Sequence, residues 1–182
     1  MSEGLKDRDT SQASQALRDQ IIALLPRLRR FCMALTGTAD AGDDLTQSTL
    51  ERVFERIEQW RPGSRLDSWM YRIAQNINID QARARKTRGV QIDSEALDDM
   101  AGDDGRQVVE GRSSLARARQ AMANLPEDQR ALMALVVIEG QSYKVAAETL
   151  GIPIGTVMSR LARARRSISD FVRGPDDTET PS

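Results

Sequence analysis

The sequence predicts an all-α protein with two small helical modules joined by a flexible acidic linker, the C-terminal module containing a helix-turn-helix. Three observations predict this class. Apolar residues recur every three or four positions in both halves, no segment alternates polar and apolar residues as a strand does, and a mostly acidic stretch separates the halves. We expect a disordered N-terminus at 1–14, modules at 15–89 and 115–173, a linker at 90–114 and a disordered tail at 174–182.

The first module should contain three helices. A second helix is expected from Asp40 to Trp60, where the sequence Arg61-Pro62-Gly63-Ser64 interrupts the pattern. A third is expected from Leu66 to Lys86, and the three helices can share one core. The first helix should end at Gly37, and its apolar stripe is Leu17, Ile21, Leu24, Leu28, Cys32 and Leu35.

The linker is expected to be unstructured because it lacks sustained periodicity and contains several glycines. Between Gln91 and Asp104 it carries six acidic residues and no basic one. Helical periodicity returns at Leu115, pauses at Pro126 and resumes at Leu132. A second helical module therefore begins after the linker.

Two short helices around a tight turn end the second module. The first should stop at Gly151, since a left-handed terminal residue costs glycine little, and Pro153 suits the first turn of the next helix. We expect the apolar faces of both helices to pack inward. These faces contain Tyr143, Ala146, Ala147 and Leu150 in the first helix, and Val157, Leu161, Ala164, Ile168 and Phe171 in the second.

The outer surface of the last helix is suited to duplex DNA. No acid lies between Ile152 and Ser169, so phosphates would meet no repulsive carboxylate. A basic amphipathic helix on its own is more often a solvated surface helix, but the preceding helix and glycine turn favour a helix-turn-helix. The candidate contact residues are Thr156, Met158, Ser159, Arg160, Arg163, Arg165 and Arg166.

Composition excludes several classes of function. The 182 residues include no histidine, which removes the commonest metal ligand and the usual catalytic triads, so we expect no enzyme, metal or cofactor. Cys32 is the only cysteine and lies on an apolar stripe, so a buried thiol is expected. The chain shows neither a bilayer-spanning apolar run nor a secretion signal, and we expect no membrane insertion and a cytoplasmic location.

Four motifs together resemble the extracytoplasmic-function (ECF) class of bacterial RNA polymerase sigma factors, in the sigma-70 family. The resemblance covers roughly Leu17–Lys86 and Leu115–Phe171. The order and separation of the motifs make it specific. They are DAGDDLTQSTLERVFERIEQW, SWMYRIAQNINIDQARARK, LPEDQRALMALVVIEGQSYKVAAETLG and GTVMSRLARARR.

The first motif is similar to the segment by which the family contacts the clamp helices of the polymerase's largest subunit. Acids near a helix N-terminus are also favoured by the helix dipole, so their presence alone would not indicate a partner. The resemblance implies polymerase contacts by Asp40, Asp43, Asp44, Leu45, Gln47 and Glu51.

The second motif is similar to the part that captures melted promoter DNA at the −10 element. Extruded bases can stack on aromatic rings or enter a loop pocket while cations hold the backbone. By spacing, Trp60 and Trp69 fall on apolar stripes and are better explained as core residues. The resemblance implies −10 contacts among Arg61, Ser64, Arg65, Trp69, Arg72, Asn76, Asp80, Arg83 and Lys86.

The resemblance assigns the last helix to the −35 promoter element. Arg160 and Arg163 are the expected readers of guanine edges, and Arg165 and Arg166 are expected to hold phosphates. Met158 and Lys144 depart from residues that many relatives carry at these positions. The promoter sequence is therefore not implied.

The function implied is a dissociable initiation subunit that binds core RNA polymerase and promoter DNA, with an anti-sigma factor as a further partner in a stress response. About 23 linker residues at ~3.4 Å each reach at most ~78 Å, and two turns of B-DNA span about 70 Å. A partner must therefore hold the modules apart. The alternative is a stand-alone helix-turn-helix regulator that binds duplex DNA without polymerase.

Overall fold

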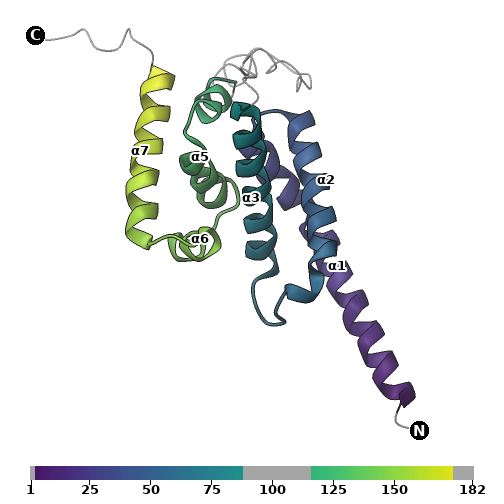
Figure 1. Cartoon of the computed structure of the whole chain (residues 1–182). Helices are drawn as coiled ribbons and strands as arrows, with labels where there is room; N and C mark the ends of the chain where they lie inside the picture. Colours follow the sequence, from purple (N-terminus) through teal and green to yellow (C-terminus); the bar gives the residue numbers. More distant parts are fainter. Residues whose placement is uncertain (1–2, 88–115, 174–182) are drawn as a thin grey trace, which may run out of the picture.

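The computed structural model describes residues 3–87 and 116–173, with helices and turns and no strand among them (Figure 1). None of the described helices is long and apolar enough to cross a membrane. The first module contains α1 (Glu3–Thr36), α2 (Ala39–Glu55), a 3₁₀ turn (Ile57–Gln59) and α3 (Leu66–Thr87). The second contains a helical segment at 116–123, α5 (Glu127–Met133), a π-turn (Ala134–Ile138), α6 (Tyr143–Leu150) and α7 (Ile154–Arg173).

Two element boundaries differ from the sequence prediction. The segment expected to be disordered over 1–14 belongs to α1 from Glu3 onward, because adding residues to an existing helix costs far less than nucleating one. The second helix stops at Glu55 instead of Trp60, and the chain continues through the 3₁₀ turn. The predicted acidic linker (90–114) and tail (174–182) lie outside the described residues.

The turn between α1 and α2 follows from local chemistry. Gly37 adopts a left-handed φ of 87° and donates its N–H to the Met33 carbonyl at 2.8 Å, which ends α1. The Thr38 hydroxyl then accepts a hydrogen bond from the Ala41 N–H and caps α2. An added Cβ on Gly42 would lie 2.7 Å from the Met33 Cα, so only glycine permits this close packing of α1 on α2.

The first helix of the helix-turn-helix ends in the cap that the sequence predicted, whereas its N-terminal cap was not predicted. Ser142 accepts a hydrogen bond from the Val145 N–H at the start of α6, and Gly151 ends α6 in the left-handed conformation, with φ 66° and ψ 37°. Val157, Leu161 and Ala164 of α7 are buried as predicted. The inward face ends there, since Ile168 is only partly buried and Phe171 is exposed.

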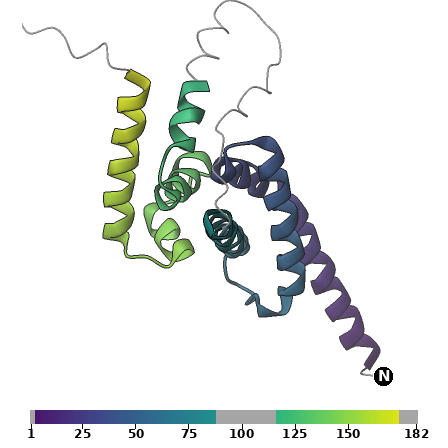
Figure 2. The same ribbon diagram turned by 45° about the horizontal axis from the view of Figure 1, so that its top comes forward.

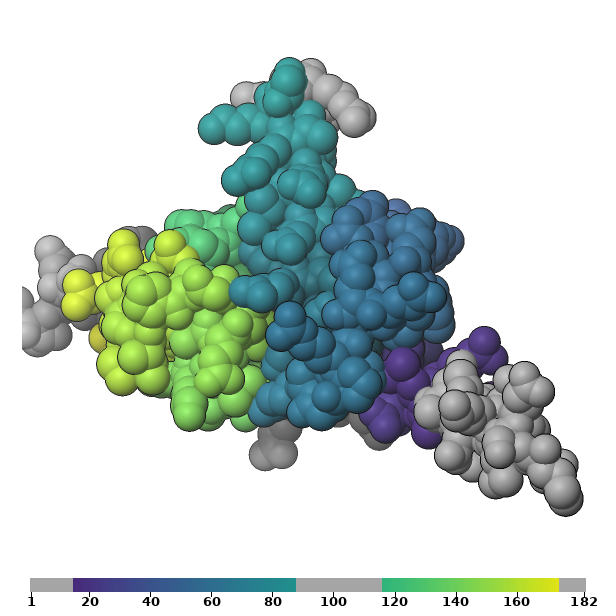
Figure 3. Space-filling view, turned by 60° about the horizontal axis from the view of Figure 1, so that its bottom comes forward, coloured from purple at the N-terminus to yellow at the C-terminus, as the bar shows by residue number. Residues whose placement is uncertain are grey.

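The two modules pack against each other instead of standing apart. Helix α3 lies between α1 and α2 on one side and α5 and α6 on the other, and Figure 2 shows α3 nearly end-on between the two halves. Buried residues of both modules form one contiguous apolar cluster, including Phe31 and Tyr71 from the first and Leu132 and Leu135 from the second. Figure 3 shows the surfaces of α6 and α7 meeting those of α3 and the loop before it.

Candidate nucleic-acid interface

Helix α7 exposes most of the side chains predicted to contact duplex DNA. Met158, Ser159, Arg163, Arg165 and Arg166 are exposed, and Thr156 is half-buried near the start of the helix. The Pro153 carbonyl accepts hydrogen bonds from the Thr156 and Val157 N–H groups, which sets the first turn and the direction of these side chains. The exposed face of α7 is therefore basic, as predicted.

Arg160 is the exception on α7, because it turns back toward its own module. Its Nε lies 2.9 Å from an Asp128 carboxylate oxygen at the start of α5, and its side chain is 29% exposed. Asp128 fixes the direction of the guanidinium in this state. Arg160 must leave this ion pair to read a guanine edge with its guanidinium fork.

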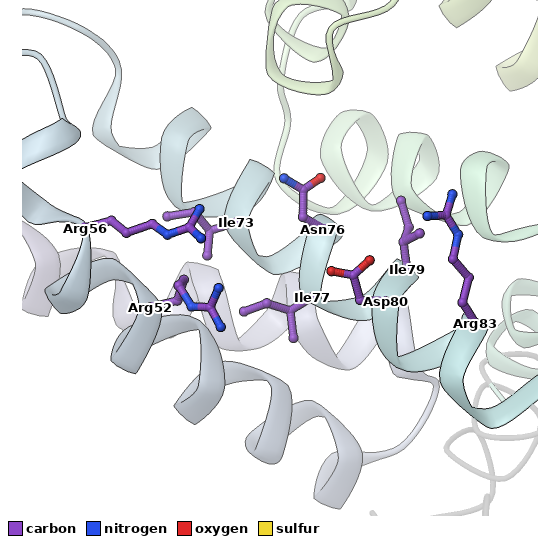
Figure 4. Close-up of a pocket in the computed structure, with 8 residues that line it drawn as sticks. All are labelled: Arg52, Arg56, Ile73, Asn76, Ile77, Ile79, Asp80 and Arg83. Carbon is purple, nitrogen blue, oxygen red and sulfur yellow. The ribbon is translucent and has the colours of Figure 1, made fainter. Parts of the chain in front are cut away.

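A surface pocket of about 340 Å³ lies along α3 where α2 ends (Figure 4). Three of the predicted −10 residues line it, namely Asn76, Asp80 and Arg83. Arg52 of α2 and Arg56, which directly follows α2, close the opposite wall, and Figure 4 shows both side chains directed toward α3. The pocket combines apolar walls with three guanidinium groups, which suits a nucleotide with its phosphate.

Arg52 and Arg56 were missed by the sequence analysis. Arg52 lies in the last turn of α2 and Arg56 directly follows the helix, with its N–H bonded to the Arg52 carbonyl, so the two lie on one side of the helix end; their spacing of four was the available signal. The resemblance assigned α2 to polymerase contacts alone. That role accounts for the acidic residues of the helix but not for its arginines. Only the packing of α2 beside α3 shows that Arg52 and Arg56 face the predicted DNA surface.

The loop before α3 carries three of the predicted −10 residues in different settings. Arg61 and Ser64 are exposed, and Gly63 takes a left-handed φ of 86° at the tip. Arg65 is held by Asp67 at 2.7 Å and by the Gln141 side-chain oxygen at 2.8 Å. In this state Arg61 and Ser64 are available to a DNA strand, whereas Arg65 is engaged between the modules.

The remaining −10 residues are divided between exposed and packed positions. Lys86 is exposed in the last turn of α3. Trp60 and Trp69 are partly buried and pack against the core, as the sequence analysis expected. Trp69 therefore has a structural role here, and its inclusion among the DNA contacts is not supported by its position.

A second pocket brings together residues predicted to bind different promoter elements. Arg72 and Asn76 of α3 line this space of about 200 Å³ together with Arg160 of α7. The Arg72 guanidinium also lies against Gly151, where an added Cβ would be 2.6 Å from Nη2. Side chains predicted to bind elements two helical turns apart thus share one crevice.

The predicted polymerase contacts lie on α2. Five of them are exposed: Asp40, Asp43, Asp44, Gln47 and Glu51. Leu45 is corrected: it is completely buried and packs in the core, so its side chain supports the helix and cannot reach a partner. Phe54, which the prediction omitted, is a large exposed apolar side chain on the same helix.

Two polar contacts organise this exposed surface of α2. Arg29 of α1 forms a bidentate ion pair with Asp43, and the hydrogen bond from Arg29 lowers the pKa of that carboxyl. Gln47 donates a hydrogen bond to Glu51 one turn later at 3.1 Å. Cys32 lies beneath, and burial raises the pKa of its thiol to about 11, so it is unreactive at neutral pH.

A buried carboxylate joins the modules. Glu139 follows the π-turn, and its side chain is 0% exposed. Its Oε2 accepts hydrogen bonds from the Tyr71 hydroxyl at 2.8 Å and from Arg27 Nε at 3.0 Å, while Arg30 Nε lies 3.3 Å from Oε1. We call these four residues the Glu139 cluster. Burial, followed by the adjacent carboxylate, raises the pKa of Tyr71, so its hydroxyl remains a donor.

The turn after Glu139 explains why this side chain enters the first module. The Glu139 N–H bonds to the Ala134 carbonyl five residues earlier, which inserts an extra residue into the helix and redirects the chain. Gly140 then adopts a left-handed φ of 67°, and Gln141 donates to Asp67 at 3.1 Å. Both polar side chains of this turn are buried against the first module.

Comparison with known proteins covers both modules. Residues 21–75 match the family described as the sigma2 domain of PhyR, and residues 115–168 match sigma-70, region 4. The ECF RNA polymerase sigma factor EcfG of Rhodopseudomonas palustris is 36% identical over 174 residues, covering 91% of this chain and 93% of that protein. The ECF sigma factor SigE of Mycolicibacterium smegmatis is 31% identical over 169 residues, covering 91% of this chain and 65% of that protein.

Solved structures show the same arrangement of helices. The sigma factor RpoE from Bartonella quintana, in complex with the anti-sigma factor NepR, superimposes with a TM-score of 0.73 at 28% identity, covering 88% of this chain and 99% of that one. The complex of PhyRSL with NepR from Sphingomonas sp. has a TM-score of 0.60 at 25% identity, covering 91% of this chain and 95% of that one.

Proposed function

The chain belongs to the extracytoplasmic-function class of RNA polymerase sigma factors in the sigma-70 family, and we propose that its two modules read the two elements of a promoter through the surfaces described above. It is a transcription initiation factor that directs core polymerase to promoters, and not an enzyme. The observation that carries this function is the relationship to EcfG across both modules, over 91% of the chain. A stand-alone regulator would need only the helix-turn-helix.

The −35 element is assigned to the exposed basic face of α7. Arg163, Arg165 and Arg166 are exposed on this helix, and no acid precedes Asp170 along it. Arg160 reads a base edge once it leaves Asp128, and its planar fork matches the paired acceptors of guanine. Ser159 and Thr156 complete the contact near the start of the helix.

The melted −10 strand is assigned to the larger pocket on α3. A base can enter between the apolar walls of Ile73 and Ile77, while Arg52, Arg56 and Arg83 lie within reach of the adjoining phosphates. Asn76 and Asp80 supply hydrogen-bonding groups to the base edge. Arg61 and Ser64 of the exposed loop extend this surface along the strand.

Core polymerase is assigned to α2. Its exposed acids and Gln47 offer charged contacts, and Phe54 supplies an apolar one. The RpoE structure holds an anti-sigma factor, and we propose that this chain has a protein inhibitor of the same kind. Its site of action is then the cytoplasm, where bacterial transcription takes place.

Reconstituted transcription tests the proposal. Core polymerase with the purified chain should initiate at a defined subset of genomic fragments, and core alone should not. The purified chain alone should show little sequence-specific retention of the same fragments at physiological salt. Tight and specific binding without polymerase, together with unchanged start sites in its presence, would favour the stand-alone regulator.

A double variant on α2, compared with a matched control elsewhere on the chain, tests whether this helix binds polymerase. Asp44→Lys with Glu51→Lys should abolish co-purification with core polymerase, because both side chains are exposed on the assigned surface. Asp170→Lys with Asp19→Lys makes the same charge change at exposed positions elsewhere and should leave the complex intact. Equal loss in both variants would show that net charge, and not the α2 surface, governs association.

A further inference from the structure

We propose that Ile154 and Met158 of α7 form an apolar edge of the recognition surface, and that this edge reads the C5-methyl groups of thymines in the −35 element. The inference rests on the proposed function, because it names what one part of the α7 surface recognises. Base readout by α7 then has two chemistries. Guanidinium groups select guanine, and the apolar edge selects thymine.

The first step of the argument is that two large apolar side chains are exposed at the start of α7. Ile154 is 47% exposed and Met158 is 52% exposed. The two are four residues apart, so their side chains lie one above the other on one side of the helix. Single exposed apolar residues are common on protein surfaces, and exposure alone therefore indicates no ligand. The surroundings of this pair identify the occupant.

The second step is that the pair belongs to a surface that attracts DNA. Arg165 follows Met158 by seven residues, which places it two turns further along the same side of the helix, and it is exposed. Arg163 and Arg166 are exposed next to this side, and no acid precedes Asp170 along α7. A duplex supplies a phosphate for each of these guanidinium groups. Charge complementarity therefore favours DNA as the occupant of the apolar edge.

The third step is the match between the helix and the bases. The first residues of a recognition helix contact base edges in the major groove. A rise of 1.5 Å per residue places Ile154 and Met158 about 6 Å apart along the helix, close to the ~7 Å of two base-pair steps. Gly155 and Ser159 beside them are exposed and small, and a Cβ added to Gly155 would meet nothing within 4 Å. The helix can approach the base edges closely at this point.

The fourth step is the chemistry of the contact. Neither Ile154 nor Met158 donates a hydrogen bond, and an apolar side chain in the major groove makes its specific contact with the thymine methyl group. This methyl group lies at the edge of the groove, next to the backbone of its own strand. Arg165, on the same side of the helix, is then placed to hold a phosphate of that strand. Enclosing one methyl group should strengthen binding about fourfold, from the transfer free energy of one buried CH₂ group.

Deoxyuridine tests this contact, because it lacks the methyl group of thymine and keeps every hydrogen-bonding group. Core polymerase with the full-length chain is bound to a promoter at which it initiates. Each thymine of the −35 element, on either strand, is replaced in turn by deoxyuridine. Wild type should bind about fourfold more weakly when a thymine that faces Ile154 or Met158 is replaced. The other replacements should have no effect.

Alanine variants identify the side chain that reads each methyl group. Met158→Ala should remove the deoxyuridine effect at one position and Ile154→Ala at another, whereas Met158→Leu should keep it, because leucine is also apolar. Val137→Ala shortens an apolar side chain that is 56% exposed outside α7, and it should leave every effect unchanged. Wild type that binds all the replaced promoters equally well, or an effect that persists in both alanine variants, would overturn the proposal.

The same holoenzyme separates this proposal from the proposed function. A holoenzyme that initiates at defined sites but does not respond to any deoxyuridine replacement would disprove thymine readout, and the function would stand. A holoenzyme that never initiates at defined sites would refute the proposed function, and the readout would fall with it.

Discussion

The Tyr71 hydroxyl donates a 2.8 Å hydrogen bond to the carboxylate of Glu139, which lies 68 residues later in the chain and in the other module. The Tyr71 ring also packs on Phe31, with ring centroids 4.7 Å apart. One side chain of α3 therefore contributes both to the core of the first module and to the contact between the modules.

Arg130→Met should destabilise the protein by about 2 kcal/mol or more, since each hydrogen bond from a charged group is worth roughly 1.5–3 kcal/mol. The Arg130 guanidinium donates to the backbone carbonyls of Leu35, Ala123 and Leu125, at 2.8, 2.6 and 2.9 Å. The Leu35 and Ala123 carbonyls lie at helix ends, where they lack helical partners, and the Leu125 carbonyl lies in the turn before α5. Urea unfolding measures the loss. Arg117→Met, at an exposed position, should change stability by less than about 0.5 kcal/mol, and an equal loss in both variants would exclude the capping role.

Gly42→Ala should destabilise the protein by roughly 1–3 kcal/mol, because the new methyl group would press on the Met33 backbone. Nothing lies within 4 Å of a Cβ added to Gly155 in α7, so Gly155→Ala should be neutral or stabilise the helix by up to about 1 kcal/mol. Thermal unfolding of the two variants compares them directly. A neutral Gly42→Ala would mean that α1 and α2 are less closely packed than described here.

Asp67→Asn should weaken the acid dependence of stability. Burial alone would raise the pKa of Asp67, but hydrogen bonds from Arg65, the Ser68 N–H and Gln141 outweigh it, so the folded pKa is lowered. The unfolded chain then takes up the proton first, and this stabilisation is present above an unfolded pKa of about 3.9 and is lost as the pH falls through the folded value. Urea midpoints measured from pH ~6 to ~3 should fall less steeply for the variant than for wild type.

Glu127 is a control for this pH series, because its pKa shift is opposite in sign to that of Asp67. Burial raises its pKa, so the folded protein takes up this proton first and gains stability as the pH falls. Glu127→Gln should therefore make the acid loss steeper than in wild type. Parallel curves for wild type and both variants would show that neither carboxyl controls acid unfolding.

Arg160→Ala should cost about 1–3 kcal/mol of binding at one or two −35 positions and relax specificity there. Holoenzyme binding to promoters with single base-pair changes measures this. Arg166→Ala should weaken binding to all sequences alike, because an exposed arginine on a phosphate carries no sequence information. A uniform loss for Arg160→Ala would instead identify Arg160 as a phosphate contact.

Arg52→Ala and Arg56→Ala should each shorten the lifetime of the open promoter complex. If each guanidinium holds one phosphate of the melted strand, the slope of log K against log salt should fall by about 0.7 per variant. Arg18→Ala, at an exposed position remote from the pocket residues in sequence, should leave the slope unchanged. An unchanged slope in both pocket variants would remove α2 from the DNA surface.

Local sequence signals were sufficient for most elements. Periodicity predicted α3 from Leu66 to Lys86, and the structure extends it by one residue; Gly151 takes the left-handed cap that its position predicted. The end of α2 was placed too late because Ile57 and Trp60 continue the apolar stripe through a 3₁₀ turn. Periodicity indicates which face of a segment is buried, but it does not distinguish the last turn of an α-helix from a 3₁₀ turn that follows it.

The candidate site was predictable only where it lies on one helix. The basic face of α7 follows from residue spacing alone, whereas the pocket between α2 and α3 requires Arg52 and Arg56 to be placed beside Asn76 and Asp80. Leu45 was predicted to contact polymerase because the whole motif was compared with the family. Its side chain is buried, whereas the other predicted contact residues of the motif are exposed.

The sequence by itself determined most of the helices, the cap at Gly151, the basic recognition surface and the sigma-factor class, because each depends on residue types at short spacing. Only the tertiary structure decided that the modules close on each other, that Arg160 and Arg72 share a crevice, and that Glu139 is buried among arginines. These relationships join side chains 88 and 112 positions apart in the chain. No local pattern encodes such contacts, since they arise from the shape and charge of surfaces that exist only after the helices have packed.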